Sequence, residues 1–411
     1  MKNYLFACGV ALLLGGVMLV GCGDKEDSKN TESSQEYIKQ ADKQIAQEMD
    51  LSQNLELKQL NNDEFMEFMN LYKDEKRSYV MKGMATFGDK SESVVAYVEI
   101  DTDIQNYSFN DTEEQQKPFE VLLSVYGSSG EKGLVSCDSD RVEIGNYANA
   151  FVIRGDIKQC VRQEKAYLNA DSTIKDFSLR QDIDKPLSRL DTLRAKAFAT
   201  NTHNGEVKSY TTLLGMPFLR YADKAVQDSI NLQLGINARS KDELLATLKQ
   251  RAESKRDKAL KQGLEFNSED LDDVWLMYVD SHIMVLGESR YIYGGGAHGL
   301  DNRAVRIFGL KNGDEIRSDT NALIDSAKAN ELLHILSQKL MAISKDLAIF
   351  EESLPLQELP KLFFIESNGI SFVWQPYEIA PYSSGDIQVF MSFADLKNFV
   401  NKESALAYLF E

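Results

Sequence analysis

The chain has 411 residues, of which 43% are hydrophobic and 27% charged, so it is long enough for two domains with hydrophobic cores and is not disordered as a whole. It carries 64 acidic against 46 basic side chains, a formal net charge of −18 at pH 7. This excess argues against nucleic acid as a partner, because the phosphate backbone is bound through lysine and arginine. It suits a solvated protein outside the cytoplasm, and it would also attract a cationic protein or peptide.

The first 22 residues have the pattern of a secretion signal. Lys2 precedes an apolar run from 4 to 20, which ends in Leu19-Val-Gly-Cys22. This ending resembles the lipobox of bacterial lipoproteins, and the resemblance implies cleavage after residue 21 and diacylation of the Cys22 thiol. Two acyl chains anchor a protein stably, whereas one does not. The alternatives are an uncleaved membrane anchor and an ordinary secretory signal.

We therefore expect a lipid-anchored protein of the cell envelope, either periplasmic or surface-exposed, at the outer rather than the inner membrane. Cleavage removes Lys2 and no carboxylate, so the mature chain is more acidic than the precursor. Its membrane contact is the lipid on Cys22.

Two cysteines remain after Cys8 is assigned to the signal and Cys22 to the anchor. Because an extracytoplasmic compartment is oxidising, Cys137 and Cys160 are expected to form a disulfide. Such a bridge closes a loop of about 22 residues and stabilises a fold by about 3 kcal/mol on the chain-entropy interpretation. The alternative is two unrelated buried thiols.

The N-terminal half divides into a tether and a β-rich region. Residues 22–50 begin as a polar tether without large apolar side chains and continue into a helical pattern at 36–49. A second short helix is expected after Asn62. From 78 to 156 apolar and polar residues alternate between turn residues, which predicts a small antiparallel β domain.

A helix is expected from 184 to 200, because Asp184 and Pro186 form a helix start and apolar residues follow at a spacing of three to four. The polar residues from 201 to 205 end it, and we place a domain boundary there. This gives an N-terminal β-rich domain with terminal helices at 51–200 and a second module at 206–411.

The second module is predicted to be α+β, an antiparallel sheet with helices packed on it. Strands are expected at 206–214, 217–221, 274–286, 303–310, 315–317, 363–365, 371–374 and 388–391, and helices at 223–234, 240–263, 330–344 and 393–408. Ser240 and Glu243 form a capping box, and Gly263 ends that helix. Its second half is basic, either a solvated face or a docking site. The five carboxylates between 265 and 273 pair with it or remain in water.

Residues 291–299 read Tyr-Ile-Tyr-Gly-Gly-Gly-Ala-His-Gly. Gly294, Gly296 and Gly299 have the spacing of a dinucleotide-binding loop, but such a loop must open a helix and here an alternating strand follows. The glycines instead predict a tight or bulged strand connection that needs positive φ, or a close approach by a ligand or another backbone. His298 is either a structural histidine bonded to this loop, or a ligand or general base.

A second unusual segment, Pro-Tyr-Glu-Ile-Ala-Pro-Tyr-Ser-Ser-Gly, spans 376–385. Its prolines fix an extended, turn-bounded loop. Tyr377 and Tyr382 are candidate binding anchors, since rigid aromatic rings are easily immobilised; alternatively they plug the end of the sheet. The chain has no signature of a nucleophile elbow, a zinc-protease helix or a phosphate-binding loop, so no catalytic residue, metal site or cofactor is predicted.

These two segments, in this order and with strands and a helix between them, resemble the C-terminal domain shared by RsiV-type anti-sigma factors and some peptidoglycan deacetylases. The resemblance covers about residues 206–400 and implies an extracytoplasmic, non-catalytic domain. RsiV uses its ectodomain as a receptor for lysozyme. The implied function is binding of lysozyme or a cell-wall component, and the candidate binding residues are Tyr291, Tyr293, His298, Tyr377 and Tyr382.

Two features depart from that family. Only residues 1–3 precede the apolar run, so no sigma-binding segment is expected, and no deacetylase motif of the form T-F-D-D-G occurs. Gly294 also stands where the family more often has threonine or serine. We expect a non-enzymatic envelope lipoprotein with an RsiV-like binding domain. The alternatives are a cell-wall-modifying hydrolase that uses His298 and the loop around Glu378, and a lipoprotein with a purely structural role.

Overall fold

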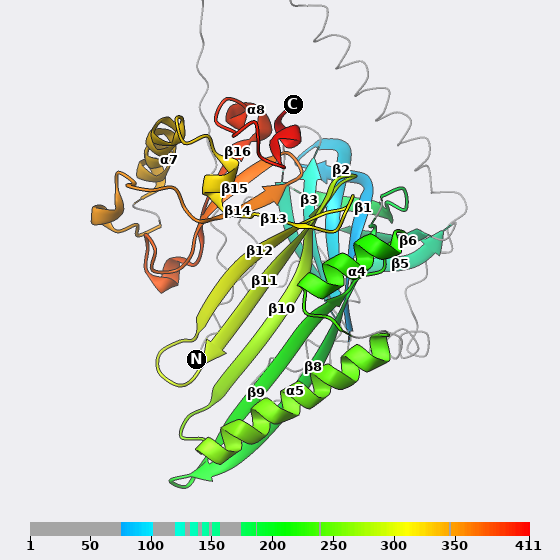
Figure 1. The fold of residues 1–411 in the computed structure, drawn as a ribbon, viewed down its shortest axis with the longest axis vertical. Coiled ribbons are helices and arrows are strands. Elements are labelled where there is room, and N and C mark those ends of the chain that lie inside the picture. Colours follow the sequence, from blue (N-terminus) through cyan, green and yellow to red (C-terminus); the bar gives the residue numbers. More distant parts are fainter. Residues whose placement is uncertain are drawn as a thin grey trace, which may run out of the picture.

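The computed structural model describes residues 75–101, 120–127, 132–138, 142–147, 150–156, 174–185, 187–237, 240–344 and 347–411 (Figure 1). The expected signal, tether and helices of residues 1–74 lie outside this part, and so do Cys22 and Cys160. Among the described residues, no helix is both long enough and apolar enough to span a bilayer.

The described residues form a mixed α and β fold with many strands and few helices, as the sequence predicts. Thirteen of the described strands belong to one twisted sheet, whose hydrogen-bonded order is β13-β12-β11-β10-β9-β8-β1-β2-β3-β4; β7 pairs with β1 and β6, and β6 with β5. In chain order these strands are β1 (Glu75–Phe87), β2 (Lys90–Asp101), β3 (Glu120–Gly127), β4 (Lys132–Asp138), β5 (Val142–Tyr147), β6 (Ala150–Asp156), β7 (Ile174–Gln181), β8 (Arg189–His203), β9 (Glu206–Phe218), β10 (Ser268–Val279), β11 (Ile283–Tyr293), β12 (Leu300–Gly309) and β13 (Glu315–Ile316).

The antiparallel β region predicted at 78–156 is confirmed. Strands β1 to β4 pair antiparallel in sequence order, and a turn at Gly88, with φ of 57°, joins the first two. Alternate residues of these strands, such as Val98, Ile100 and Leu123, are buried in one core. Burying each such side chain contributes about 1.5 to 3 kcal/mol.

The helix expected at 184–200 is wrong, because this segment forms strand β8. Leu193, Ala195 and Ala197 are buried at every second position, the period of a strand. Strand β8 pairs with β1 on one side and with β9 on the other, so two neighbours satisfy its backbone and override the local helical spacing. The predicted boundary at 201–205 falls on the Asn204-Gly205 turn of the β8–β9 hairpin, so the sheet is continuous across it.

The two helices expected after β9 are confirmed. Helix α4 (Lys224–Gln233) begins at the Asp223 N-cap, and α5 (Lys241–Gln262) begins at Ser240 and ends at Gly263, with φ of 84°. They form the crossover between β9 and β10, which are parallel. This parallel pair departs from the purely antiparallel sheet expected for the module.

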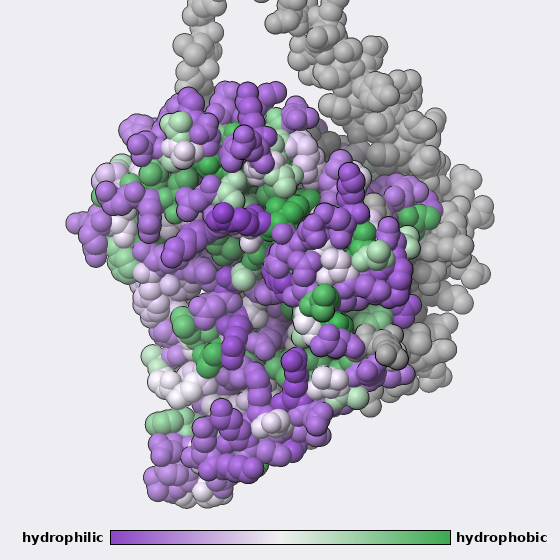
Figure 2. All heavy atoms as spheres, viewed as in Figure 1, coloured by the Kyte–Doolittle hydropathy of each residue, from purple (hydrophilic) through white to green (hydrophobic). Residues whose placement is uncertain are grey.

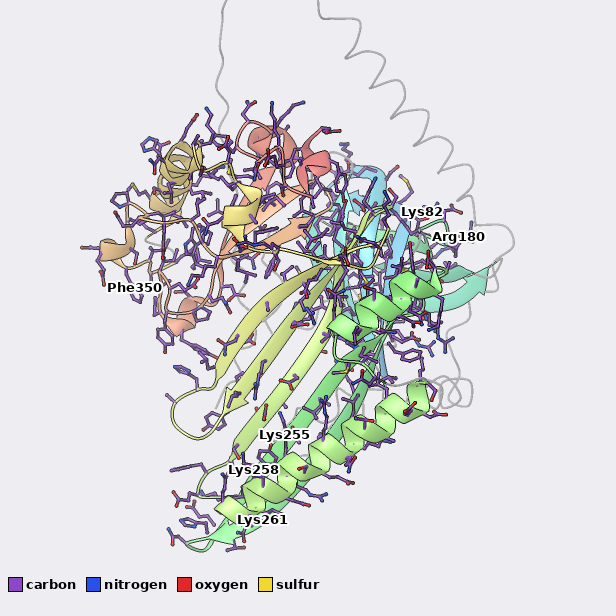
Figure 3. The ribbon with its side chains drawn as sticks, in the orientation of Figure 1. Lys82, Arg180, Lys255, Lys258, Lys261 and Phe350 are labelled. Carbon is purple, nitrogen blue, oxygen red and sulfur yellow. The ribbon has the colours of Figure 1, made fainter. Side chains whose placement is uncertain are left out.

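Helix α5 covers the face of β8 and β9 that carries Leu193 and Leu214, through Leu244, Leu248 and Ala252. Lys255 turns towards the sheet, and its Nζ lies 2.7 Å from the Asp270 carboxylate, one of the two predicted uses of the acidic segment. Lys258 and Lys261 follow along the exposed side of the helix (Figure 3), and the surface over this end of α5 is largely hydrophilic (Figure 2).

The single strand expected at 274–286 is instead two strands, β10 and β11. The carboxylate of Asp280 accepts hydrogen bonds from the backbone N–H groups of His282 (2.6 Å) and Ile283 (2.8 Å), which stabilise a tight turn inside the alternating run. The hairpin predicted at Asn312-Gly313 is confirmed: Gly313 has φ of 75°, and β13 follows.

A second sheet of three strands contains β14 (Leu362–Glu366), β15 (Gly369–Trp374) and β16 (Ile387–Ser392), all close to the expected positions. It packs on one face of β10 to β12, where Val285 and Ile307 share a core with Phe363. Helix α4 packs on the opposite face, against Phe308. The remaining elements are α6 (Thr320–Leu323), α7 (Ala329–Ile343), α8 (Phe393–Leu396) and the 3-10 turns at Glu351–Ser353, Tyr382–Ser384 and Ala407–Phe410.

The helix expected at 393–408 is correct only for the single turn of α8. Beyond it the chain forms turns, an isolated bridge at Val400 and the 3-10 turn Ala407–Phe410. The Asn401 N–H donates to the Leu323 carbonyl and the Asp325 N–H to the Phe399 carbonyl, each at 2.8 Å. Phe399 and Val400 are buried by this pairing, so tertiary packing determines the backbone here.

A buried ion cluster links strands β1, β2 and β8 to strand β10. Lys76 is only 1% exposed, and its Nζ lies 2.7 Å from Asp273 and 3.1 Å from Glu99. Arg194 contacts Asp101 at 2.6 Å and Asp273 at 3.3 Å. Burial opposes ionisation of Asp273, but the charges of Lys76 and Arg194 outweigh it and lower its pKa to about 2.

Candidate functional site

The glycine segment forms the loop between β11 and β12. Strand β11 ends at Tyr293 and β12 begins at Leu300, while Gly295 and Gly296 have φ of 95° and 98°. L-residues rarely adopt such angles, so the predicted strand connection with positive φ is confirmed. The Tyr293 hydroxyl donates to the Gly296 carbonyl at 3.0 Å and braces the loop from within. A strand rather than a helix follows, which excludes the dinucleotide interpretation.

Gly299 is needed for a different reason, the close approach of Tyr291. A Cβ added at Gly299 would collide with the Tyr291 ring, so the ring lies directly against this backbone. Burial and the nearby charge of Glu269 raise the pKa of Tyr291 to about 12. The hydroxyl therefore stays protonated at neutral pH and acts as an uncharged contact.

His298 is exposed, and both of its ring nitrogens have partners. Nδ1 lies 2.8 Å from the Gly299 carbonyl, and Nε2 lies 3.0 Å from the Tyr377 hydroxyl. A carbonyl only accepts, so Nδ1 carries a proton and, in the neutral ring, Nε2 accepts from Tyr377. The histidine thus ties the glycine loop to the segment 376–385.

The ring of Tyr382 completes this contact. It stacks on His298 with centroids 3.8 Å apart and planes 8° apart, while Tyr377 lies 6.2 Å from both rings. Aromatic pairs of this kind contribute about 0.5 to 1.5 kcal/mol beyond their buried area. We call His298, Tyr377 and Tyr382 the Tyr–His cluster. Two segments that the sequence marks as unusual therefore meet at one place.

Tyr377 occupies a strained backbone position, with φ of 73° in a non-glycine residue. Such a conformation costs about 1 to 3 kcal/mol and persists only where surrounding contacts enforce it. The Tyr377 N–H donates to the Ala380 carbonyl at 2.9 Å, and Glu378 accepts from the Gln375 N–H at 2.8 Å. The side chain remains 54% exposed, so the strain presents the ring to solvent rather than burying it.

Carboxylates surround the cluster. Arg303 on β12 lies 2.8 Å from Asp386 and 3.3 Å from Asp301, and Glu378 is close by. Burial raises the pKa of Asp386, and Arg303 opposes this rise. Burial and Asp301 also raise the pKa of Tyr382. With three carboxylates against one guanidinium, the immediate surroundings are acidic.

Of the predicted site residues, His298, Tyr377 and Tyr382 come together, Tyr291 lies under the loop and Tyr293 braces it. Cys137 is fully buried in β4 and disulfide-bonded. Its predicted partner Cys160 and the lipidation residue Cys22 lie outside the described residues, so the pairing and the lipidation remain predictions.

Sequence reasoning missed Arg303, Gln375 and Asp386, because single polar residues at strand ends carry no motif. One signal was available. In an alternating strand, Arg303 shares a face with the apolar Val305, and a charge on the inner face of a strand must find a partner.

A second histidine, His282, has a serine and an aspartate beside it. Ser281 Oγ lies 3.0 Å and Asp280 Oδ1 lies 4.0 Å from the same ring nitrogen, Nδ1. A catalytic relay needs its nucleophile and carboxylate on opposite nitrogens, so this group does not form one. Across the described ranges, no cluster of three or more histidine, cysteine or acidic side chains has the arrangement of a metal site.

Comparison with known proteins identifies one domain. Residues 322–394 match the family described as "Protein of unknown function (DUF3298)", a range that includes the segment 376–385. A solved DUF3298 family member from Bacteroides fragilis NCTC 9343 is 15% identical, with a TM-score of 0.40, covering 54% of this chain and 97% of its own. A DUF3298 family protein from Pseudomonas aeruginosa PAO1 is 17% identical, with a TM-score of 0.34, covering 51% and 94%. No curated protein matches the sequence.

Proposed function

We propose that this protein is an envelope lipoprotein, anchored through Cys22, whose RsiV-like region at about residues 206–400 is a non-catalytic receptor for a basic protein of the lysozyme type. The observation that carries this proposal is the Tyr–His cluster, in which rings from two distant segments are stacked, hydrogen-bonded and still accessible to solvent.

Preorganisation supports a binding role. The stack on His298, the hydrogen bond to its Nε2 and the strained backbone at Tyr377 all restrict the rings before any ligand arrives. Rings that are already ordered lose little conformational entropy on binding, and exposed tyrosines are frequent anchors of protein interfaces.

Charge supports a cationic ligand. The whole chain carries −18, and around the cluster Asp301, Glu378 and Asp386 outnumber Arg303. Complementary charge raises the rate of association and makes it depend on salt, because ions screen the attraction over about 8 Å at physiological strength. A basic lysozyme fits this field, and the resemblance to RsiV supports the same ligand.

Calorimetry tests the proposal. The chain from residue 23 to 411 is titrated with hen lysozyme at low and at physiological salt. We expect binding that is tighter at low salt, and a loss of about 2 kcal/mol or more for Tyr382→Ala, as for the central aromatic anchors of other interfaces. The matched control is Phe390→Ala, which removes a ring that is 40% exposed on β16, where it pairs with Ser371 on β15 rather than belonging to the segment 376–385.

Absence of heat at both salt concentrations would sink the lysozyme version. Co-sedimentation with isolated peptidoglycan is then measured with the same three proteins. If Tyr382→Ala sediments less than the wild type and Phe390→Ala, the ligand of the cluster is a cell-wall component. If all three proteins sediment equally, the cluster has no role in binding.

One observation favours a second candidate, a cell-wall hydrolase. The Tyr377 hydroxyl lies 3.0 Å from Nε2 of His298, within reach of a base that could activate it. Nδ1 is held by the Gly299 carbonyl rather than by a carboxylate, which leaves this pair a weaker catalyst than a triad. Release of soluble peptidoglycan fragments that stops in Tyr377→Phe would support this candidate over the receptor.

A further inference from the structure

Arg303 joins the two segments that form the Tyr–His cluster. Its Nη1 lies 2.8 Å from Asp386, directly after the segment 376–385, and its Nε lies 3.3 Å from Asp301 on β12 itself. Its backbone N–H also donates to the side-chain oxygen of Gln375 at 2.7 Å, directly before that segment. One residue of the sheet thus holds both ends of the loop that carries Tyr377 and Tyr382.

These contacts are shielded from solvent. The side chains of Arg303 and Asp386 are only 10% and 8% exposed, whereas Tyr377 is 54% exposed. A ligand that reaches the rings therefore does not need to touch the guanidinium. The Arg303–Asp386 pair is also geometrically specific, because guanidinium donors bind carboxylates in fixed directions.

We propose that Arg303 is a positioning residue of the binding site: with Asp386 it holds the segment 376–385 against β12, so that Tyr382 stacks on His298 and Tyr377 reaches Nε2. This inference rests on the proposed receptor function for its purpose, although the geometry it describes exists without ligand. The competing explanation is that the pair only stabilises the fold.

A lysine could not do the same work. Its single ammonium group can reach one carboxylate but does not present the fixed fork that spans Asp301 and Asp386. The backbone N–H that donates to Gln375 remains in methionine and lysine substitutions at this position, so these variants of Arg303 test its side chain alone.

The same strand offers a matched control. Arg306 also forms a charged pair, with Glu315 at 2.7 Å, but it points to the opposite face of β12, away from the cluster. Arg306→Met therefore removes an arginine–carboxylate pair of similar kind without touching the loop that carries Tyr377 and Tyr382.

The test uses the chain from residue 23 to 411 with its histidines labelled with carbon-13 at Cε1. The protein has four histidines, so the spectrum is simple, and His298→Gln assigns the signal of interest. Stacking on Tyr382 shifts the His298 ring proton upfield through the ring current of tyrosine. We expect this upfield shift to be lost in Arg303→Met, retained in Arg306→Met and partly restored in Arg303→Lys.

An unchanged His298 signal in Arg303→Met overturns the inference, whatever happens to the melting temperature, because a merely stabilising pair would lower the melting temperature without moving this signal. If Arg303→Met does not fold, Asp386→Ala decides the question from the loop side: loss of the shift supports positioning, and an unchanged shift contradicts it.

Binding separates this inference from the proposed function. Removing a cation makes the site more acidic, which on charge alone would strengthen the binding of a basic protein. We expect the opposite, an affinity for hen lysozyme lower by about tenfold in Arg303→Met, because misplaced anchors weaken binding. If the wild-type chain binds no lysozyme, the proposed ligand fails while the His298 signal still decides the role of Arg303.

Discussion

The ring of Tyr382 lies flat on the imidazole of His298, with centroids 3.8 Å apart and planes 8° apart, although the two residues lie in loops that connect strands of different sheets. The three-stranded sheet packs on one face of β10 to β12, which brings the segment between β15 and β16 onto the β11–β12 loop. The site therefore depends on the docking of the two sheets rather than on either segment alone.

The stack should contribute measurably to stability. Tyr382→Phe keeps the aromatic ring and is expected to unfold at nearly the wild-type urea concentration. Tyr382→Ala removes the contact and should lower the free energy of unfolding by about 1 kcal/mol beyond the loss of buried area. Equal stability of the two variants would contradict the importance of the stack.

The glycines of the loop should differ in their tolerance of a methyl group. Gly299→Ala places a Cβ into the Tyr291 ring and is expected to cost about 1 to 3 kcal/mol in urea unfolding. Gly294→Ala is the control, because its φ is not positive and the added Cβ meets nothing within 4 Å in the described residues beyond its two chain neighbours. It should change stability by less than about 0.5 kcal/mol. A larger loss of stability in Gly294→Ala than in Gly299→Ala would contradict the close contact between Gly299 and the Tyr291 ring.

The buried ion cluster predicts an acid-labile contribution to stability. The pKa of Asp273 is lowered to about 2 in the folded chain, so its contribution is present above its unfolded pKa and lost as the pH falls towards 2. Because about a third of this side chain is exposed, we expect a loss of about 1 kcal/mol rather than the full value of the shift.

Asp273→Asn provides the comparison. Urea unfolding at pH 7 and at pH 3 should show a smaller difference between the two pH values in this variant than in the wild type. An identical pH dependence in both proteins would show that Asp273 does not cause the loss of stability in acid. Glu99 has the opposite tendency, since burial and the charge of Asp273 raise its pKa, and Asp273→Asn removes the second of these causes.

The continuous sheet predicts which fragments fold. Residues 206–411 lack β8, so β9 would lose its hairpin partner and α5 would lose part of the face it covers. We expect this fragment to unfold without a cooperative transition, whereas residues 75–411 unfold cooperatively. A cooperative transition in the shorter fragment would support an independent domain beginning at residue 206.

Lipidation at Cys22 is tested in the bacterial envelope. Labelled palmitate should be incorporated into the wild-type chain and not into Cys22→Ala, and the variant should be found as an uncleaved precursor. Incorporation that survives the substitution would place the lipid elsewhere, and cleavage that survives it would favour an ordinary secretory signal.

Much of the fold follows from local signals. Ser240 and Gly263 predict both ends of α5, and the glycines at 295 and 313 predict strand connections, because capping and positive φ depend on a few neighbouring residues. The sequence marks both unusual segments as sources of candidate binding residues, and the ring contacts between His298, Tyr377 and Tyr382 bring the two segments together.

The two wrongly predicted helices share one cause. Strand β8 has helical spacing in sequence but lies between two strands, and the helix at the end of the chain stops after one turn because Val400 and Asn401 pair with the backbone at 323–324. The role of Arg303 depends on a loop more than seventy residues away. Long-range pairing of this kind determines structure without leaving a local pattern, so only the folded chain reveals it.

The proposed receptor role depends most directly on whether a basic protein reaches the Tyr–His cluster. The chain labelled with carbon-13 at histidine Cε1 is titrated with unlabelled hen lysozyme, and the signals of His298 and of the exposed His334 on α7 are followed together. We predict a saturable shift of the His298 signal with little change at His334, and no such shift in Tyr382→Ala. An unmoved His298 signal at saturating lysozyme would contradict the assignment of this cluster as the receptor surface.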